Sequence, residues 1–119
     1  MAWTYDSTNA EQGSDVINYW KYRQVRGNLQ MRLTDVAIAN GERWYSAVYF
    51  ICVIDRSGRV HGDTSITKTW GQAANYKTIA VVPNLAVRFQ IRASVRRSNG
   101  IEVYNWWSAQ MRWDNTSIS

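Results

Sequence analysis

The fold is decided by the segment "LAVRFQIRASVRRSNGIEVYNWWSAQMRW", residues 85–113. Apolar and polar residues alternate along its first half. The apolar set falls on one face: Leu85, Val87, Phe89, Ile91, Ala93 and Val95. Alternation with a period of two is typical of a strand that buries one face and exposes the other to water. With the turn residues "SNG" at 98–100, the segment predicts a β-hairpin.

The length of the turn sets the pairing of this hairpin. A two-residue loop would place Arg92 opposite Trp107 and so mix polar with apolar residues. A three-residue loop that ends at Gly100 keeps the apolar residues together, and a slip of one residue would turn a whole face over. The expected pairs are Arg97 with Ile101, Val95 with Val103, Ile91 with Trp107, Phe89 with Ala109 and Val87 with Met111. Trp107 is therefore expected in the core and Trp106 outside it.

Two further three-residue turns end in glycine, "ANG" at 39–41 and "RSG" at 56–58. We expect each, like "SNG", to be a type I turn closed by a left-handed glycine. A change of parity between Leu33 and Val36 predicts a β-bulge near Thr34–Asp35. The expected pairs around these turns are Ile38 with Glu42, Val36 with Trp44, Asp55 with Arg59, Ile54 with Val60, Val48 with Ile66 and Trp44 with Trp70.

The whole chain, residues 1–119, is expected to form one all-β domain with a short polar tail at 114–119. Seven or eight strands are predicted, at roughly 2–6, 16–26, 29–38, 42–55, 59–70, 76–82, 85–97 and 101–113. Turns at this spacing favour a single antiparallel β-sandwich, either immunoglobulin- or fibronectin-III-like or jelly-roll-like.

The segment "VVPNLAVRFQIRASVRRSNGIEVYNWWSA", residues 81–109, resembles the closing hairpin of a fibronectin type III domain. The residues that carry the resemblance are Pro83, Phe89, Ile91, Ala93, Gly100, Trp107 and Ser108. The resemblance covers about a quarter of the chain and implies a β-sandwich. Val87 stands where that family has its corner tyrosine, and no early tryptophan strand matches. We therefore keep the architecture and assign no family.

The composition points to an anionic partner. The chain carries a formal net charge of +5, and eleven of its fourteen basic residues are arginine. It also holds seven tryptophans and seven tyrosines. Arginine stacks on aromatic rings and binds carboxylate, sulfate or phosphate with a planar fork. A basic, aromatic-rich surface therefore favours a negatively charged ligand without identifying it.

The residue types needed for catalysis are scarce. There is one histidine, His61, and one cysteine, Cys52, which are too few for a zinc site of imidazole and thiolate ligands. Cys52 shares a strand face with Phe50 and Ile54, so we expect a buried, inert thiol on the opposite face of the sheet from His61. No carboxylate pair of glycosidase type and no phosphate-binding glycine loop is present. We therefore expect no enzyme activity, no metal and no cofactor.

The candidate ligand-binding residues lie on the outer face of the predicted last hairpin: Arg88, Arg92, Arg96, Tyr104 and Trp106. The register places Arg92 opposite Trp106 and Arg96 opposite Glu102. Exposed tryptophan, tyrosine and arginine are enriched at binding hot spots. The same cross-strand pairs also stabilise a solvated sheet, and the two interpretations are compatible.

A second cluster of aromatic and basic residues is "INYWKYRQVRG", residues 17–27. Such interleaving suits single-stranded nucleic acid, which binds by base stacking and phosphate contact. The chain has few lysines and no nucleic-acid-binding motif, so we do not expect a nucleic acid partner.

The leading functional hypothesis is a non-catalytic, lectin-like domain that binds a glycan, an anionic surface or a protein. The segment "RWYSAVYFICVID", residues 43–55, is apolar on both faces, which favours the first alternative, a structural subunit of a homo-oligomeric assembly. The second alternative is a small, toxin-like protein at a membrane surface, because tryptophan and tyrosine favour the bilayer interface. No signal peptide is visible, so we expect a mature secreted protein or an assembly component rather than a cytoplasmic one.

Overall fold

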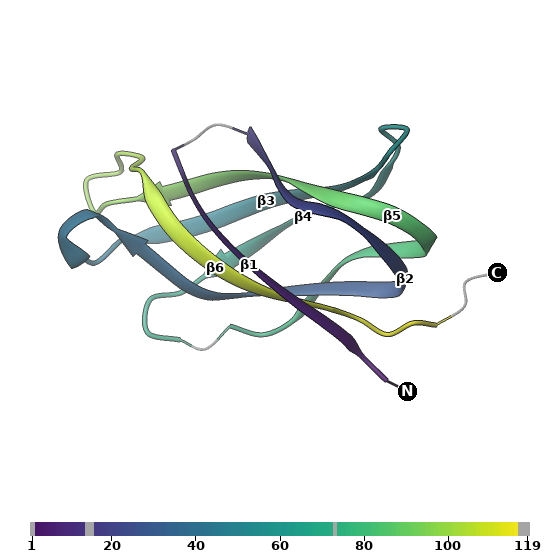
Figure 1. Cartoon of the computed structure of the whole chain (residues 1–119). Helices are drawn as coiled ribbons and strands as arrows, with labels where there is room; N and C mark the ends of the chain where they lie inside the picture. The colour runs from purple at the N-terminus through teal and green to yellow at the C-terminus, as the bar shows by residue number, and fades with distance from the viewer. Residues whose placement is uncertain (1, 14–15, 73, 117–119) are drawn as a thin grey trace.

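Strands make up the regular structure of the described residues, apart from one short 3₁₀ turn, η1 (Ala39–Gly41). The computed structural model describes residues 2–13, 16–72 and 74–116, with side chains for all of these except 16–20. Within them, one antiparallel sheet has the strand order β1-β6-β2-β5-β3-β4 (Figure 1). The strands are β1 (Thr4–Gln12), β2 (Val16–Ile38), β3 (Ser46–Asp55), β4 (Val60–Lys68), β5 (Lys77–Arg96) and β6 (Asn105–Trp113). The predicted all-β class is confirmed.

Two strands are long enough to serve both halves of the sheet, and each of them bends. The first part of β2 pairs with the second part of β5, whereas beyond the bend β2 pairs with the first part of β5 and with β6. The bends face each other, because Gly27 lies opposite Val82 and a shift of register separates this pair from Val25 and Leu85. Gly27 has a φ of +94° and Asn84 a φ of +57°, values at which the chain turns sharply without leaving the sheet.

These bends explain why the described residues form six strands where the sequence predicts seven or eight. The breaks in the pattern at 27–28 and at 83–84 are irregularities within β2 and β5, so the predicted strands on either side of each break form one continuous strand. A bulge interrupts the alternation of side chains as a loop does, but it leaves the neighbouring residues hydrogen-bonded to the sheet.

A buried aspartate just beyond β6 fixes the bend of β2. Oδ1 of Asp114 accepts a hydrogen bond from the backbone nitrogen of Asn28 (2.9 Å), and Oδ2 accepts one from the side-chain Nδ2 of Asn28 (2.6 Å). The backbone nitrogen and the hydroxyl group of Thr116 also donate to Oδ1, at 3.2 and 2.7 Å. The hydrogen bonds from Asn28 and Thr116 hold the pKa of Asp114 well below its usual range. The predicted polar tail therefore begins with a structural anchor, and residues 117–119 lie outside the described part of the chain.

The two halves of the bent sheet bury their inner faces against each other. The ring of Tyr49 in β3 packs edge-to-face on Trp107 in β6, with 5.9 Å between the ring centroids. The Tyr49 hydroxyl donates to Oδ1 of Asn105 (2.6 Å), and Nε1 of Trp107 donates to Oε1 of Gln12 (2.9 Å). Asn105 and Gln12 are both buried, so each of these hydrogen bonds satisfies polar groups that burial would otherwise penalise.

The predicted hairpin at 98–100 is confirmed from its turn as far as the predicted pair of Val95 with Val103, where the backbone nitrogen of Val103 donates to the backbone oxygen of Val95 (2.9 Å), and is wrong beyond that pair. The backbone nitrogen of Arg97 donates to the backbone oxygen of Ile101 (3.1 Å), and Gly100 has a φ of +83°. After Val103 the chain leaves β5, and β6 pairs with β1 and β2 instead. The hairpin that resembles a fibronectin type III domain is therefore not formed beyond Val103. The predicted pairs that are wrong are Ile91 with Trp107, Phe89 with Ala109 and Val87 with Met111.

The inward and outward assignments of the two adjacent tryptophans are nevertheless confirmed. Trp107 is 2% exposed and Trp106 is 42% exposed. Both assignments hold because the alternation of side chains belongs to the strand itself, whichever neighbour the strand pairs with.

The "RSG" turn forms the predicted hairpin, here between β3 and β4. Its glycine, Gly58, has a φ of +86°, and Gly41 in the "ANG" turn has a φ of +66°, so both left-handed glycines are confirmed. A register shift follows the pair of Ile54 with Val60, and His61 is left without an opposite residue. The predicted pair of Val48 with Ile66 is therefore wrong by one residue, since Ile66 lies opposite Tyr49.

The "ANG" turn does not join two paired strands, because β3 pairs with β4 and β5 and not with β2. The predicted strand pairing of Val36 with Trp44 is replaced by a hydrogen bond from Nε1 of Trp44 to the backbone oxygen of Val36 (3.0 Å). The predicted bulge near Thr34–Asp35 is confirmed by the register shift between Leu33 and Asp35.

The predicted inward face of β3 is wrong. Phe50, expected inside, is 39% exposed, and Cys52 is half-buried. The strand is apolar on both faces, so its pattern carries no signal for which face is inward. The side chains that β3 gives to the core cluster are Ala47, Tyr49, Ile51 and Val53. Ile54, also predicted inside, is buried at the end of the strand.

Trp107→Ala should lower the free energy of unfolding by about 3–5 kcal/mol, because it removes a large buried ring. Trp106→Ala should cost far less, because the ring it removes is already partly in water. Urea unfolding of both variants measures the difference. Equal, large losses would contradict the assignment of the two faces of β6.

Gly27→Ala should lower the free energy of unfolding by about 3 kcal/mol or more. Its new methyl group would overlap Oδ1 of Asp114, and its φ of +94° disfavours any side chain. Gly13→Ala is the matched control, because no atom lies within 4 Å of the position of its methyl group. Thermal unfolding followed by circular dichroism should leave the Gly13→Ala midpoint almost unchanged. Similar midpoints for the two variants would show that the bend does not depend on glycine.

Candidate functional site

A hollow of the described surface lies over β1, β6 and the second part of β2. Its volume is about 750 Å³. We call it the Tyr76 hollow, after the tyrosine that precedes β5. The lining residues are Tyr5, Asp6, Ser7, Arg32, Tyr76, Gln110 and Arg112. Arg32 and Arg112 point outward because they alternate with the buried Met31, Leu33, Met111 and Trp113.

Two arginines of the Tyr76 hollow stack on a single ring. The guanidinium carbon of Arg112 lies 4.0 Å from the centroid of Tyr76, and that of Arg32 lies 4.7 Å from it. Arg112 also lies 4.1 Å from the ring centroid of Trp3. The two charges are therefore closer together than the roughly 10 Å Debye length of 0.1 M salt.

Cross-strand glutamines hold these guanidinium groups in place. Arg32 lies opposite Gln110 and Arg112 lies opposite Gln30 in the pairing of β2 with β6. Nε of each arginine donates to the amide oxygen of its glutamine, in both cases at 2.8 Å. Among the described residues, no carboxylate forms an ion pair with either arginine. The hollow therefore presents two arginines that are fixed in position and form no ion pair among the described residues. The one acidic residue in its lining, Asp6, is ion-paired with Arg23 (3.1 Å).

The other half of the sheet also places two arginines beside one tyrosine ring. We call its outer surface, made of Tyr22, Phe50, Arg56, Arg88 and Arg92, the Tyr22 face. The guanidinium carbons of Arg56 and Arg88 lie 4.3 and 4.9 Å from the centroid of Tyr22, and that of Arg92 lies 4.4 Å from Phe50. Nε of Arg88 is buried and has no hydrogen-bond partner among the described residues. The ion pairs of that same part of the chain include none of these three arginines.

The structure divides the predicted ligand-binding residues among three places. Arg88 and Arg92 belong to the Tyr22 face, where Arg92 lies opposite Phe50 and not opposite Trp106, so that predicted pair is wrong. The predicted pair of Arg96 with Glu102 is confirmed by a bridge between them and by an ion pair of 3.0 Å. The predicted residues are separated because β6 pairs with β1 and β2 after the turn, and not with β5.

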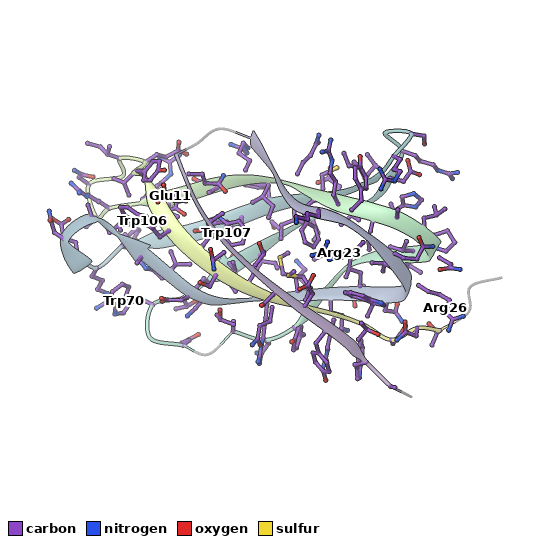
Figure 2. The ribbon with its side chains drawn as sticks, in the orientation of Figure 1. Glu11, Arg23, Arg26, Trp70, Trp106 and Trp107 are labelled. Atoms are coloured by element: carbon purple, nitrogen blue, oxygen red, sulfur yellow. The ribbon has the colours of Figure 1, made fainter. Side chains whose placement is uncertain are left out.

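Tyr104 and Trp106 lie apart from the arginines, beside the end of β1. Their rings pack edge-to-face with 5.4 Å between centroids, and Nε1 of Trp106 donates to Oε2 of Glu11 at 2.5 Å (Figure 2). Partial desolvation and the nearby Glu11 carboxylate raise the pKa of Tyr104. This aromatic pair therefore has an acidic neighbour, which makes it a poor place for an anion.

The Tyr76 hollow is absent from the sequence-based prediction. Arg32 and Arg112 stand in "QMRL" and "QMRW", where a glutamine and an arginine flank a core methionine. That alternation marks both arginines as outward. Bringing them onto one tyrosine requires the pairing of β2 with β6, which the predicted hairpin of β5 with β6 excluded.

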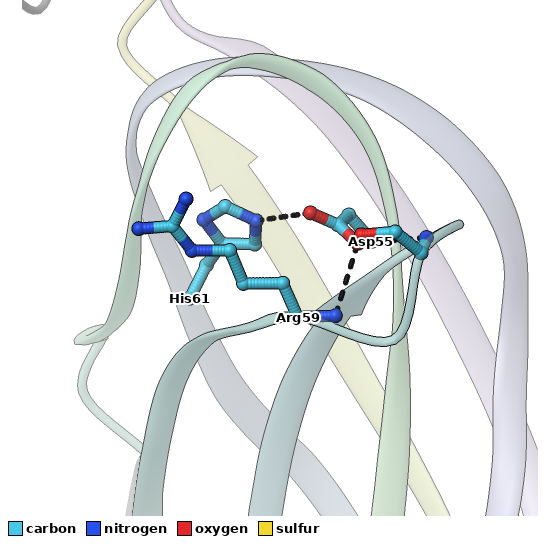
Figure 3. Close-up of polar contacts among 4 residues, drawn as sticks. Asp55, Arg59 and His61 are labelled. Carbon is cyan, nitrogen blue, oxygen red and sulfur yellow. Dashed lines mark hydrogen bonds and ion pairs between the residues drawn. The ribbon is translucent and has the colours of Figure 1, made fainter.

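His61 and Asp55 are joined by a polar contact at the turn between β3 and β4 (Figure 3). Nε2 of His61 lies 2.8 Å from Oδ2 of Asp55. The hydroxyl group of Ser57 donates to the same carboxylate (2.6 Å), as does the backbone nitrogen of Arg59 (3.1 Å). The hydrogen bonds from Ser57 and His61 hold the pKa of Asp55 well below its usual range. Since the serine binds the aspartate and not the histidine, the trio lacks the nucleophile–base contact of a hydrolase.

Cys52 is half-buried on the outer side of β3, so the prediction of a buried thiol is wrong. Burial and the charge of Asp63 raise its thiol pKa, which is the direction expected of an unreactive cysteine.

Within residues 2–13, 16–72 and 74–116, no group of three or more histidine, cysteine or acidic side chains is placed to hold a metal ion. The same residues include no helix of the length and apolarity needed to cross a membrane.

Comparison with known proteins assigns the chain to no family. No protein-family model matches the sequence, and a search of curated proteins finds no relative.

Proposed function

We propose that the protein is a non-catalytic binding domain, a β-sandwich that recognises an anionic ligand through arginines stacked on aromatic rings. The observation that carries this proposal is the Tyr76 hollow, where two arginines share one ring and have no carboxylate partner among the described residues. Two like charges held so close repel each other. An anionic group that enters the hollow relieves this repulsion and uses the planar donor fork of arginine.

The arginines of the hollow are ordered before any ligand arrives. Each one is held by a ring and by a hydrogen bond from Nε to a glutamine. Nη2 of Arg32 also donates to Oε1 of Gln110 (2.5 Å), so Nη1 of Arg32 and the terminal nitrogens of Arg112 are the groups that would donate to a ligand. Binding therefore loses little side-chain entropy, and pre-organisation of this kind raises affinity.

The surroundings of the arginines favour an acidic glycan among anionic ligands. Tyr5 is 62% exposed at the rim of the hollow and offers an open ring to a sugar face. Ser7 and Gln110 provide polar groups for sugar hydroxyls. A glycan that carries carboxylate or sulfate groups would use the ring, the polar groups and the arginines together.

Arg32→Gln and Arg112→Gln should each weaken binding to a heparin hexasaccharide by roughly tenfold or more, because a charge-assisted hydrogen bond contributes about 1.5–3 kcal/mol. Arg43→Gln is the matched control: it removes the same charge from an arginine that lies 5.8 Å from the ring of Trp70, outside the hollow. Isothermal titration calorimetry at low and physiological salt measures the affinities, and binding should weaken as salt rises.

Equal affinities for the Arg43→Gln control and the two hollow variants would contradict the proposed site. Failure of the unmodified protein to bind heparin would contradict the proposal of a sulfated or uronate-bearing ligand. Heparin binding that does not weaken as salt rises would contradict recognition of the ligand by charge.

A second candidate function is a structural subunit of a homo-oligomer. β1 is an edge strand of the sheet, and no described strand pairs with its outer side. Its sequence, "TYDSTNAEQ", contains no proline or lysine, the residues that commonly protect such edges from pairing with another chain. Light scattering after size-exclusion chromatography distinguishes this role, since a stable dimer that Thr8→Pro converts to a monomer would favour it.

A third candidate is a protein of membrane surfaces. Tyr45, Ile101 and Tyr104 are 75%, 60% and 50% exposed, and such side chains favour the interface of a bilayer. Sedimentation with anionic liposomes that Arg32→Gln does not change, and that Tyr45→Ser abolishes, would favour this role over the Tyr76 hollow.

A further inference from the structure

We propose that the Tyr22 face is a second site for the same acidic polysaccharide, so that one protein chain cross-links two polysaccharide chains. This inference rests on the proposed function of the Tyr76 hollow and goes beyond it. The two places have the same construction, a tyrosine with two arginines beside its ring: Arg32 and Arg112 at Tyr76, and Arg56 and Arg88 at Tyr22.

The two sites face in opposite directions. Arg88 and Arg92 alternate along β5 with the buried Phe89 and Ile91, as Arg32 and Arg112 alternate with Met31 and Met111. The buried residues of both sets belong to one core, which lies between the two halves of the sheet. Each set of arginines therefore points away from that core on its own side, and Figure 2 shows side chains leaving both sides of the folded ribbon.

The two sites share no residue and come from different parts of the sheet. The Tyr76 hollow is built from β1, β6 and the second part of β2, whereas the Tyr22 face is built from the first part of β2, from β3 and from β5. Occupation of one site leaves the other free. A ligand chain on each side of the molecule would then be joined through the protein.

The chemistry of the Tyr22 face selects a polyanion. Arg56, Arg88 and Arg92 bring three positive charges that have no ion-pair partner among the described residues, and Nε of Arg88 is a buried donor that lacks an acceptor there. A second copy of the chain, with a net charge of +5, would add repulsion to this face. Nucleic acid bases would find the ring of Tyr22 already in contact with two guanidinium groups, so base stacking there is disfavoured.

The test compares the unmodified protein with a double variant of each site. Arg88→Gln with Arg92→Gln changes the Tyr22 face, Arg32→Gln with Arg112→Gln changes the Tyr76 hollow, and Arg43→Gln is the control. Titration calorimetry with a heparin hexasaccharide should give two ligands per chain for the unmodified protein and the control, and one for each double variant. Full-length heparin near equal site concentrations should produce large complexes by dynamic light scattering, which disperse in excess heparin. Neither double variant should form them.

The outcomes separate the two proposals. One hexasaccharide per unmodified chain, lost in the variant of the Tyr76 hollow, would overturn the second site and leave the proposed function standing. No binding by the unmodified protein would overturn both. Two ligands per chain in the Arg88→Gln and Arg92→Gln variant would place the second site elsewhere and overturn the inference.

Two controls keep the test decisive. If the double variant of the Tyr22 face fails to fold by circular dichroism, Arg56→Gln replaces it, because Arg56 lies in the exposed turn after β3. That variant should weaken the second binding step by roughly tenfold and leave the first unchanged; an unchanged second step would overturn the inference. Single-stranded oligothymidylate should not form large complexes, and complexes as large as those with heparin would overturn the choice of a polysaccharide.

Discussion

The hydrogen bonds of Asp114 at the bend of β2 are the constraint on which the rest of the structure depends. The buried carboxylate accepts both hydrogen bonds of Asn28 and closes against Gly27, where no side chain fits. Because the bend is fixed there, the first part of β2 can pair with β5 while the second part pairs with β6. One strand thereby joins two halves of a sheet whose inner faces meet. A buried carboxylate without hydrogen-bond donors would strongly destabilise the fold, so the stability of the bend depends on the four groups that donate to Asp114.

The bend also decides where the charged side chains gather. β2 carries Tyr22 before the bend and Arg32 after it, and these two residues belong to the Tyr22 face and to the Tyr76 hollow. Exposed contacts between arginine and an aromatic ring stabilise a protein by only about 0.5–1 kcal/mol each. Placing two unneutralised arginines on one ring works against that small gain. The proposed anionic ligand would supply the missing negative charge at both places.

The sequence predicts the faces of the strands better than it predicts their neighbours. The alternation from Val87 to Val95 and the three glycine turns follow from local geometry, and the structure confirms them. Leu85, predicted on the same buried face, is 36% exposed beside the bend of β5. The pairing of β6 depends on competition among strands far apart in the chain, which alternation does not resolve. In β3 the sequence does not predict the buried face either. Phe50 and Ile51 are both apolar, and only the tertiary structure decides which of them is buried.

The candidate sites show the same limit. Arg88 and Arg92 were predicted to be outward and functional, and they are outward, but their aromatic neighbours come from β2 and β3 rather than from β6. The Tyr76 hollow needs three strands and a loop to meet, so no single segment of the sequence contains its signal. Asp114 lies in a stretch predicted to be a polar tail, and nothing in its local sequence reveals that it binds Asn28, 86 residues earlier, beside Gly27.

The most direct test of the account is to observe the arginine side chains themselves while a ligand binds. Two-dimensional ¹H–¹⁵N spectra of the Nε–Hε groups, recorded as a heparin hexasaccharide is added, report on each guanidinium group separately. The account predicts that the signals of Arg32 and Arg112 shift and sharpen, while the signal of Arg43 and the indole signal of Trp106 stay in place. Shifts confined to Trp106 and its neighbours, with those of Arg32 and Arg112 unchanged, would contradict it.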